Sequence, residues 1–231
     1  MDDDAIVRSE LLGSLFPAQV VAFEARALVQ DAGSLLQEEA AHVARASPKR
    51  LREFATGRAC ARRALAELGL TGVALAAAPD RSPRWPESVV GSLTHTDGYC
   101  AVVVGRKERI SGIGVDAEGR GKVDSSLWDL IFTPIEIARL TALPPQRQPD
   151  TATILFSAKE TFFKCQYPLT QEWIDFRDVA IDIDSCGFSV HPLRDLRIES
   201  RCTAPLTGRF AICEDLVITG MFMPHECIGQ T

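Results

Sequence analysis

The sequence predicts a mixed α/β (α+β) fold, in which two long helices alternate with groups of short strands. Two observations support this prediction. Apolar residues recur at helical spacing after Ser47 and again after Asp150, and short segments rich in β-branched residues lie between and after these stretches. With 231 residues, the chain is long enough for one large domain or for two small halves with a true core.

Composition excludes several classes of protein. The chain is 46% hydrophobic and 24% charged, which is typical of a soluble globular protein, and no apolar run is long enough to span a membrane. A formal net charge of -6 argues against a nucleic-acid binder. The acidic start Met1–Asp4 does not resemble a secretory or transit signal, and the seven cysteines form no C-x-x-C pair. We therefore expect a cytoplasmic protein with reduced thiols and no zinc site.

The first helix is expected to begin after Ser47, a good N-cap residue that is followed by Pro48 at the first helical position. Gly69 and Gly72 supply its stop signal. For any single basic residue on this helix, a solvated surface position is the simpler interpretation. As a cluster in an acidic protein they suggest an anion site, since guanidinium groups match the geometry of phosphate. The basic residues are Lys49, Arg50, Arg52, Arg58, Arg62 and Arg63.

A hairpin follows this helix. The segments 89–95 and 99–104 are rich in valine, and the Asp97-Gly98 pair between them is a turn signal. His95 is thus expected at a strand end beside the turn. A structural hydrogen bond is the more common role for a lone histidine, but binding residues also gather at such positions.

The segment 112–118 reads as a third strand with two different faces. Ile113 and Val115 point to one side, whereas Asp116 and Glu118 share the other side with two glycines. Two carboxylates beside positions without side chains could hold a hard divalent cation close to a phosphate-bearing ligand. The alternative is a surface strand whose acids face water.

A capping box and a second long helix come next. Thr133 and Glu136 have the spacing of a capping box, which explains Glu136 without placing it in a site. The helix is expected to begin near Asp150. Glu160 and Lys164 are four residues apart, so either they form a surface ion pair or they face a site as a carboxylate and a cation. The expected core stripe is Ile154, Leu155, Ala158, Phe162 and Cys165.

After Pro168 the chain reads as β-rich, with expected strands at 179–183, 188–190 and 216–222.

Four blocks in this order resemble the Sfp-type 4'-phosphopantetheinyl transferases, in the branch of the enterobactin-synthetase and mycobacterial enzymes. The resemblance runs from about residue 47 to residue 176. The third and fourth blocks are specific as a pair. The blocks are 50–58 (RLREFATGR), 91–96 (GSLTHT), 112–118 (GIGVDAE) and 156–164 (FSAKETFFK).

The resemblance implies an enzyme of the holo-[acyl-carrier-protein] synthase type. Such an enzyme transfers the phosphopantetheine arm of coenzyme A to a serine of an apo acyl, aryl or peptidyl carrier protein, and releases adenosine 3',5'-bisphosphate. The carriers belong to fatty-acid, polyketide, nonribosomal-peptide or siderophore synthesis. The implied fold is two similar α/β halves with pseudo-two-fold symmetry, residues 1–112 and 113–231, that form one compact unit with the active site in the cleft between them. A monomer is expected.

Site residues are implied position by position. Asp116, Glu118 and Glu160 match the acids that bind Mg2+, for which Mn2+ is an alternative. Glu160 is also the expected base, and Lys159 and Lys164 match lysines beside the pyrophosphate. The residues that match contacts to the coenzyme A phosphates are Arg50, Arg58, His95 and, as a further candidate, Arg62.

One departure from the family concerns the loop before Trp85-Pro86, where some relatives place a basic residue at the adenosine end of coenzyme A. Here 76–78 are alanines, and only Arg81 and Arg84 are nearby. Two other classes of function stay open. One is a non-catalytic module that binds coenzyme A or carrier proteins. The other is a metal-dependent hydrolase of the coenzyme A pyrophosphate.

Overall fold

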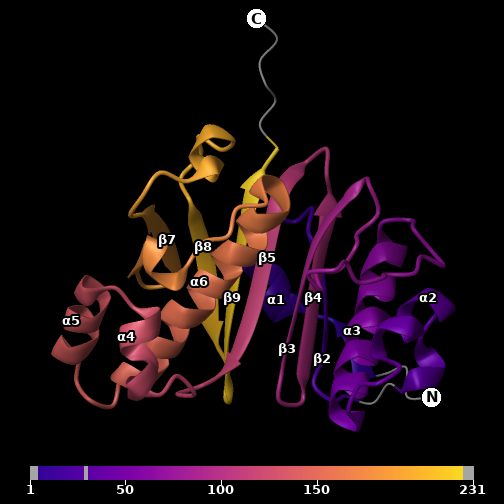
Figure 1. Cartoon of the computed structure of the whole chain (residues 1–231), viewed down its shortest axis with the longest axis horizontal. Helices are drawn as coiled ribbons and strands as arrows, with labels where there is room; N and C mark the ends of the chain where they lie inside the picture. The colour runs from indigo at the N-terminus through magenta and orange to yellow at the C-terminus, as the bar shows by residue number, and fades with distance from the viewer. Residues whose placement is uncertain (1–4, 29–30, 226–231) are drawn as a thin grey trace, which may run out of the picture. The chain divides into compact units, whose positions relative to one another are not determined.

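The computed structural model describes residues 5–28 and 31–225, in two compact units, Met1–Ile110 and Ser111–Thr231 (Figure 1). Helices and antiparallel sheets occur in both units, so the predicted mixed α+β class is confirmed. The acidic start Met1–Asp4 and Cys227 lie outside the described residues.

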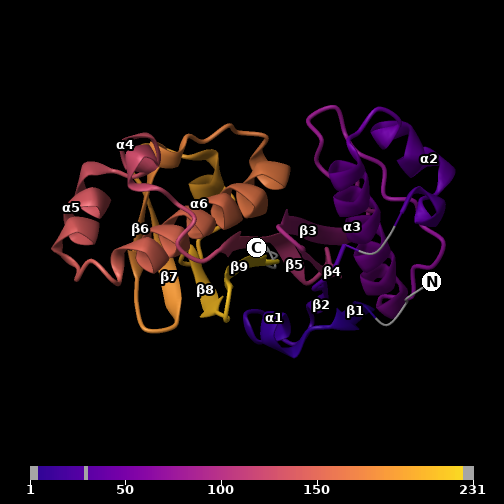
Figure 2. The ribbon, with the colours of Figure 1, turned by 90° about the horizontal axis from the view of Figure 1, so that it is seen from below.

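The first unit is a four-stranded antiparallel sheet with one long helix. The strand order is β1-β2-β4-β3, and α3 lies across β2 and β4 (Figure 2). Its elements are β1 (Ile6–Arg8), α1 (Glu10–Ser14), β2 (Val21–Ala25), α2 (Gln37–Ala40), α3 (Pro48–Glu67), β3 (Val89–Thr96) and β4 (Tyr99–Arg106), with short 3-10 helices at Ala32–Ser34 and Ala41–Val43.

The local signals in this unit act as predicted. The Ser47 hydroxyl caps α3 by accepting from the backbone N–H of Arg50 at 3.3 Å, and Pro48 occupies the first turn. Just beyond the helix, Gly69 has a φ of 77°, a left-handed conformation that glycine adopts without strain. Gly98 (φ 72°) turns β3 into β4 and brings His95 opposite Cys100.

The second unit is a five-stranded sheet of order β5-β9-β8-β7-β6, with α6 packed on β9 (Figure 1). Its elements are β5 (Ile110–Gly119), α4 (Trp128–Ile131), α5 (Pro134–Ala142), α6 (Gln148–Thr170), β6 (Val179–Ile183), β7 (Gly187–Pro192), β8 (Thr207–Ile212) and β9 (Leu216–Pro224), with 3-10 helices at Ser125–Leu127, Phe176–Asp178 and Arg197–Ser200.

Helix α6 is the main structural support of this unit. All five residues of its predicted core stripe are buried, and most of them belong to one apolar core with Phe188 and Met221 of the sheet. The helix begins two residues before Asp150 and continues past Pro168 to Thr170, where Gln171 adopts a left-handed φ of 53°. It therefore presents one buried face to the sheet and a second, partly exposed side on which aromatic residues such as Phe163 stand next to Glu160 and Lys164.

The glycines of β5 allow α6 to approach the strand closely. A Cβ atom at Gly112 would lie 2.7 Å from the carbonyl oxygen of Cys165, and one at Gly114 would overlap the carbonyl oxygen of Thr161. A residue with a side chain at either position would push the helix away. The two glycines thus set the distance between the strand and α6.

Some elements were not expected from the sequence, namely β1, α1, β2, α2, α4 and β8. Strand β8 alternates between exposed and half-buried residues and contains Gly208, so it lacks the apolar pattern of its neighbours. All six cysteines in the described ranges are free thiols, and four of them are buried. Within those same ranges, no helix combines the length and the apolarity needed to cross a bilayer.

Candidate active site

Strand β5 contributes two acids to the candidate site, Asp116 and Glu118. Asp116 is only 3% exposed, whereas Glu118 is half-buried toward the end of the strand. Burial, the negative charge of Asp116 and that of Glu160 together raise the pKa of Glu118 to about 7, although the positive charge of Lys164 partly opposes them. Loss of hydration and mutual repulsion both act against the charged form. The strand therefore carries two neighbouring carboxylates, and the charged form of Glu118 is disfavoured.

Helix α6 contributes a third carboxylate and a cation. The pKa of Glu160 is raised by burial and by Asp116, and lowered in part by Lys164. Lys164 Nζ donates to Asp116 Oδ1 at 2.6 Å. The predicted alternative, a surface pair of Glu160 with Lys164, is thus replaced by an ion pair that joins α6 to β5. The three acids and Lys164 form one electrostatic cluster, which we call the acidic cluster.

Asp116 has a second partner that the sequence reasoning missed. Its Oδ2 accepts a hydrogen bond from Ser157 Oγ at 2.8 Å, and Ser157 is completely buried. Ser157 stands in the fourth sequence block, but nothing in its spacing identifies Asp116 as its partner. Both oxygens of Asp116 are therefore oriented by groups on α6.

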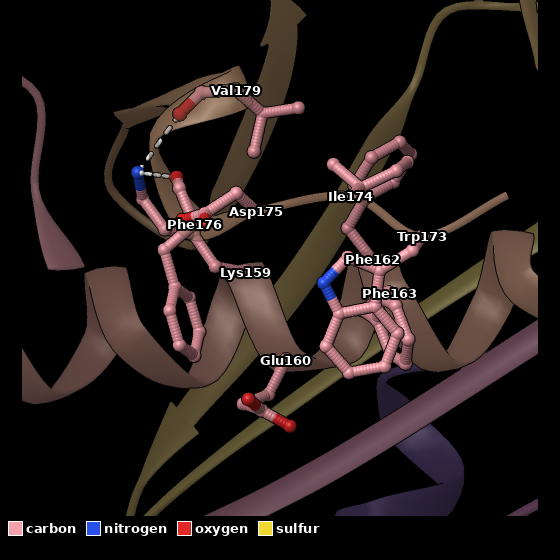
Figure 3. A pocket seen from close by; sticks show the side chains of 9 residues that line it. All are labelled: Lys159, Glu160, Phe162, Phe163, Trp173, Ile174, Asp175, Phe176 and Val179. Atoms are coloured by element: carbon pink, nitrogen blue, oxygen red, sulfur yellow. Dashed lines mark hydrogen bonds between the residues drawn. The ribbon is translucent and has the colours of Figure 1, made fainter. Parts of the chain in front are cut away.

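Lys159 points to the opposite side of α6 from Glu160 (Figure 3). Its Nζ donates to Glu136 Oε2 at 2.9 Å and to the carbonyl oxygens of Phe176 at 2.6 Å and Val179 at 2.8 Å, and its side chain is 1% exposed. Burial lowers the pKa of Lys159, and the charge of Glu136 opposes this effect. A contact of Lys159 with phosphate, as the resemblance implies, would require the ammonium group to leave these three acceptors.

Glu136, predicted as a capping residue only, has a second role. It forms the capping box with Thr133, and its Oε1 also accepts from the backbone N–H of Ile181 at 2.8 Å. Glu136 and Lys159 thus tie α5, α6 and β6 together in the interior of the unit.

A cavity of about 360 Å³ lies beside Glu160 (Figure 3). Its wall is formed by α6 and by the segment 173–176, and most of the lining side chains are aromatic or aliphatic. The Phe163 ring stacks on Tyr167 and meets Trp173 edge-on, each at 5.1 Å between centroids. Trp173 is 75% exposed, so the cavity is bordered by an uncovered aromatic surface. A carboxylate next to an apolar cavity suits a reaction on a long, partly apolar substrate.

The basic residues of the first unit differ in how exposed they are, and therefore in how readily they could bind an anion. Arg50 donates to His95 Nε2, and both side chains lie within 3.4 Å of Glu53 Oε2. Arg58 is 3% exposed and donates to the carbonyl oxygen of Leu75 at 2.6 Å, and burial lowers its pKa to about 10. Arg50 and His95 form a partly exposed pair, whereas Arg58 is held in the interior.

Arg62 is bound at both ends of its guanidinium group. It donates to Glu39 Oε2 at 2.7 Å and to the carbonyl oxygen of Ser34 at 2.6 Å. Its role in an anion site therefore has weaker support than that of Arg50.

A cavity of about 690 Å³ opens next to Arg50. It is lined by the alanine loop 76–78, His42, Arg81 and Arg84, and among the described lining residues none is acidic. Arg81 adopts a left-handed φ of 71°, which few non-glycine residues do. Arg81 and Arg84 thus line a cavity whose charged side chains are basic, which suits an anionic ligand.

The acidic cluster fits a hard divalent cation by its chemistry. The three acids supply carboxylate oxygens, the donors that Mg2+ and Mn2+ prefer, and the charge of Asp116 raises the pKa of both Glu118 and Glu160. Within the described residues, no three acidic, histidine or cysteine side chains already stand in a metal-holding arrangement. The cation of the cluster in this structure is the ammonium group of Lys164.

Comparison with known proteins gives a consistent result. A family model described as the 4'-phosphopantetheinyl transferase N-terminal domain matches residues 38–105, and a model of the 4'-phosphopantetheinyl transferase superfamily matches residues 112–212. Together the two matches contain the basic helix, the hairpin with His95 and the acidic cluster.

Individual relatives agree with the family models. The chain is 41% identical to the 4'-phosphopantetheinyl transferase Svp of Streptomyces mobaraensis, over 81% of this chain and 78% of that protein. It is 35% identical to the 4'-phosphopantetheinyl transferase PptT of Mycobacterium tuberculosis, over 92% of this chain and 98% of that protein. Enterobactin synthase component D of Escherichia coli K12 is 36% identical over 54% of this chain and 58% of its own length.

Proposed function

This chain belongs to the 4'-phosphopantetheinyl transferase superfamily and is a phosphopantetheinyl transferase of the holo-[acyl-carrier-protein] synthase type. From this premise, we propose a role for each residue of the site. We propose that it transfers the phosphopantetheine arm of coenzyme A to a serine of an apo acyl, aryl or peptidyl carrier protein, and releases adenosine 3',5'-bisphosphate. The observation that carries this assignment is the acidic cluster of Asp116, Glu118 and Glu160.

Asp116, Glu118 and Glu160 would hold Mg2+, or Mn2+, in this proposal. A bound divalent cation neutralises charge on the phosphates of coenzyme A as the pyrophosphate bond breaks. The crowding of carboxylates supports the assignment, because their repulsion is relieved when a cation binds. Lys164, now on Asp116, is within the same cluster and could turn to a phosphate oxygen when a metal ion takes its place.

Glu160 is the proposed general base. Its raised pKa makes it a better proton acceptor than an ordinary carboxylate, and it lines the apolar cavity where the arm of coenzyme A or the acceptor serine could enter. A serine hydroxyl is a weak nucleophile at neutral pH, so removal of its proton during attack on the phosphorus accelerates the transfer. Lys159 remains a predicted phosphate contact.

The coenzyme A phosphates are assigned to the basic residues of the first unit. Arg50 and His95 are the best supported, because they are partly exposed and adjacent to each other. Arg58 and Arg62 extend the positive field from the same helix. These groups position the substrate and take no part in the bond changes.

The carrier protein requires a local docking surface, since this chain has a net charge of -6 and carriers of this kind are expected to be acidic. We propose the aromatic surface of Phe163, Tyr167 and Trp173, because Trp173 is exposed, the other two rings are half-buried against it or beside it, and the surface borders the cavity beside Glu160. Arg120 is a basic residue that could also contact an acidic carrier, but it already pairs with Asp150 at 2.6 Å. We further propose a monomeric enzyme that works in the cytoplasm, without nucleic acid as a partner.

The first test is intact-protein mass spectrometry of an apo carrier protein incubated with the enzyme, coenzyme A and Mg2+. The expected result is a mass gain of one phosphopantetheine, which is lost with EDTA, with a serine-to-alanine carrier or with Glu160→Gln. Coenzyme A binding without any gain on several carriers would favour a binding module. Release of free phosphopantetheine without a carrier would favour a hydrolase.

A further inference from the structure

Two buried hydroxyl groups continue the hydrogen bond from Ser157 into the interior of the second unit. Ser157 Oγ lies 2.7 Å from Thr219 Oγ1 on β9, and Thr219 Oγ1 lies 2.6 Å from Thr161 Oγ1 on α6. All three side chains are completely buried. Ser157 and Thr161 are one turn apart, so they present their hydroxyl groups on one face of the helix, on either side of Thr219.

Proton counting fixes the direction of the first hydrogen bond. A carboxylate can only accept, so the one proton of Ser157 points to Asp116 Oδ2. The one proton of Thr219 then faces two acceptors on Ser157, the hydroxyl oxygen at 2.7 Å and the carbonyl oxygen at 3.0 Å. The one proton of Thr161 likewise faces Thr219 Oγ1 at 2.6 Å and the Thr219 carbonyl oxygen at 3.3 Å. The two threonines therefore hold Ser157 in place from the side opposite to Asp116.

We infer that Ser157, Thr219 and Thr161 form a hydroxyl relay that positions the carboxylate of Asp116 for metal binding. This inference rests on the proposed function, because it assumes that Asp116 is a metal ligand. None of the three is a catalytic residue here: they act through Asp116. Asp116 lies on β5, and the relay links it to α6 and β9, so three elements together fix one carboxylate.

The relay would keep the Asp116 carboxylate in a fixed orientation. Lys164 holds the other oxygen of Asp116, but its side chain is 27% exposed and flexible. The relay side of the carboxylate is dry and packed, so it keeps the plane of the carboxylate fixed when Lys164 moves. Outer hydrogen-bond partners of metal-binding carboxylates typically change metal affinity by about 10- to 100-fold.

The test measures Mn2+ binding to the free enzyme by electron paramagnetic resonance, with the metal alone as the probe. Ser157→Ala is expected to weaken Mn2+ binding by about 10-fold or more. Thr219→Val removes the next hydroxyl group with little change of shape and is expected to weaken binding less. Thr219→Ser keeps the hydroxyl group and is expected to bind Mn2+ as the wild type does.

Thr153→Val is the matched control. Thr153 is buried on the same helix, one turn before Ser157, and its hydroxyl group donates to the carbonyl oxygen of Pro149 at 2.9 Å, outside the relay. The melting temperature of each variant is recorded, so that loss of folding is separated from loss of metal affinity. The relay is supported if the two variants Thr153→Val and Thr219→Val are equally stable but only Thr219→Val binds Mn2+ more weakly.

Two results would overturn the inference. Wild-type Mn2+ affinity in folded Ser157→Ala or in Thr219→Val means that the hydroxyl groups only fill space. Equal weakening by Thr219→Ser and Thr219→Val means that packing, and not the hydroxyl group, matters. If the wild-type enzyme itself binds no Mn2+ while it still modifies a carrier, the proposed metal site is wrong, which is a different failure.

Discussion

Glu136 illustrates how one residue can satisfy several buried groups. Its Oε2 accepts from the backbone N–H of Thr133 at 2.7 Å and from Lys159 Nζ at 2.9 Å, while Oε1 accepts from Ile181. Lys159 in turn holds the segment that forms the wall of the cavity beside Glu160. This buried pair therefore connects the cap of α5 to the shape of the site.

Glu136→Ala is expected to lower the free energy of unfolding by about 3–5 kcal/mol, because it leaves the Lys159 ammonium group buried without a counter-charge. Chemical denaturation monitored by circular dichroism measures the loss. The control is Arg139→Ala on the same helix, which breaks an exposed pair with Asp182 and should cost less than about 1 kcal/mol. Similar losses in both variants would contradict the prediction.

Glu118 should make the metal-free enzyme more stable in mild acid. Its pKa is about 7 in the folded state and lies near 4.5 when the chain is unfolded, so the folded state binds the proton more readily between these values. The contribution of Glu118 is therefore least favourable above pH 7 and improves as the pH falls toward 4.5. In EDTA, the melting temperature should rise from pH 8 to pH 6, and Glu118→Gln should flatten this rise. An unchanged pH profile in that variant would refute the assignment.

At the scale of elements, the contact of β5 with α6 decides where the acids meet. Gly114→Ala would press a methyl group against the carbonyl oxygen of Thr161 and the backbone nitrogen of Cys165, and neither can move without the helix. We expect a loss of about 1–3 kcal/mol or more in stability, together with weaker metal binding, because α6 carries Glu160 and Lys164. Calorimetric melting of the variant measures the loss.

Gly119→Ala is the matched control on the same strand. There the added methyl group would meet only the flexible side chain of Lys122, which can swing away. Its stability should stay within about 0.5 kcal/mol of the wild type. If both variants melt alike, the close approach of helix and strand is not what fixes the site.

The sequence predicted these two elements well but not all of their partners. The apolar stripe of α6 is a local pattern, and burial confirmed it. Burial does not alternate in β5, where residues 112–117 are all buried, but positions 112, 114 and 116 do share the side that faces α6. The burial of Lys159 was not predictable, since its acceptors at Glu136, Phe176 and Val179 are far away in the chain. For the same reason the spacing of Glu160 and Lys164 suggested a pair within the helix, whereas Lys164 reaches across to Asp116.

Prediction also failed where local signals are weak. The first strands, β1 and β2, are short and gain their stability from pairing with each other and with β4. Such pairing is a property of the assembled sheet, which no local window of sequence contains. The assignment of the site residues to metal, phosphate and base therefore stays a prediction, carried by resemblance and chemistry.

At the scale of the whole molecule, the two units have separate cores, so a ligand of one need not stabilise the other equally. Mg2+ is expected to slow amide hydrogen exchange in β5 and α6 and to leave α3 and β4 nearly unchanged. Glu160→Gln should abolish this local effect. Hydrogen-exchange mass spectrometry with and without Mg2+ measures it, and a uniform slowing across both units would contradict the proposed position of the metal.

The exposed indole of Trp173 gives this enzyme a built-in optical reporter. Its ring is 75% exposed and touches Phe163 at the edge of the cavity, whereas Trp85 and Trp128 are packed against the two cores. The red-shifted part of the tryptophan emission therefore comes from the surface where a carrier is proposed to dock. Covering that surface shifts the emission to shorter wavelength, so docking can be followed in real time without a label and separately from the chemical step.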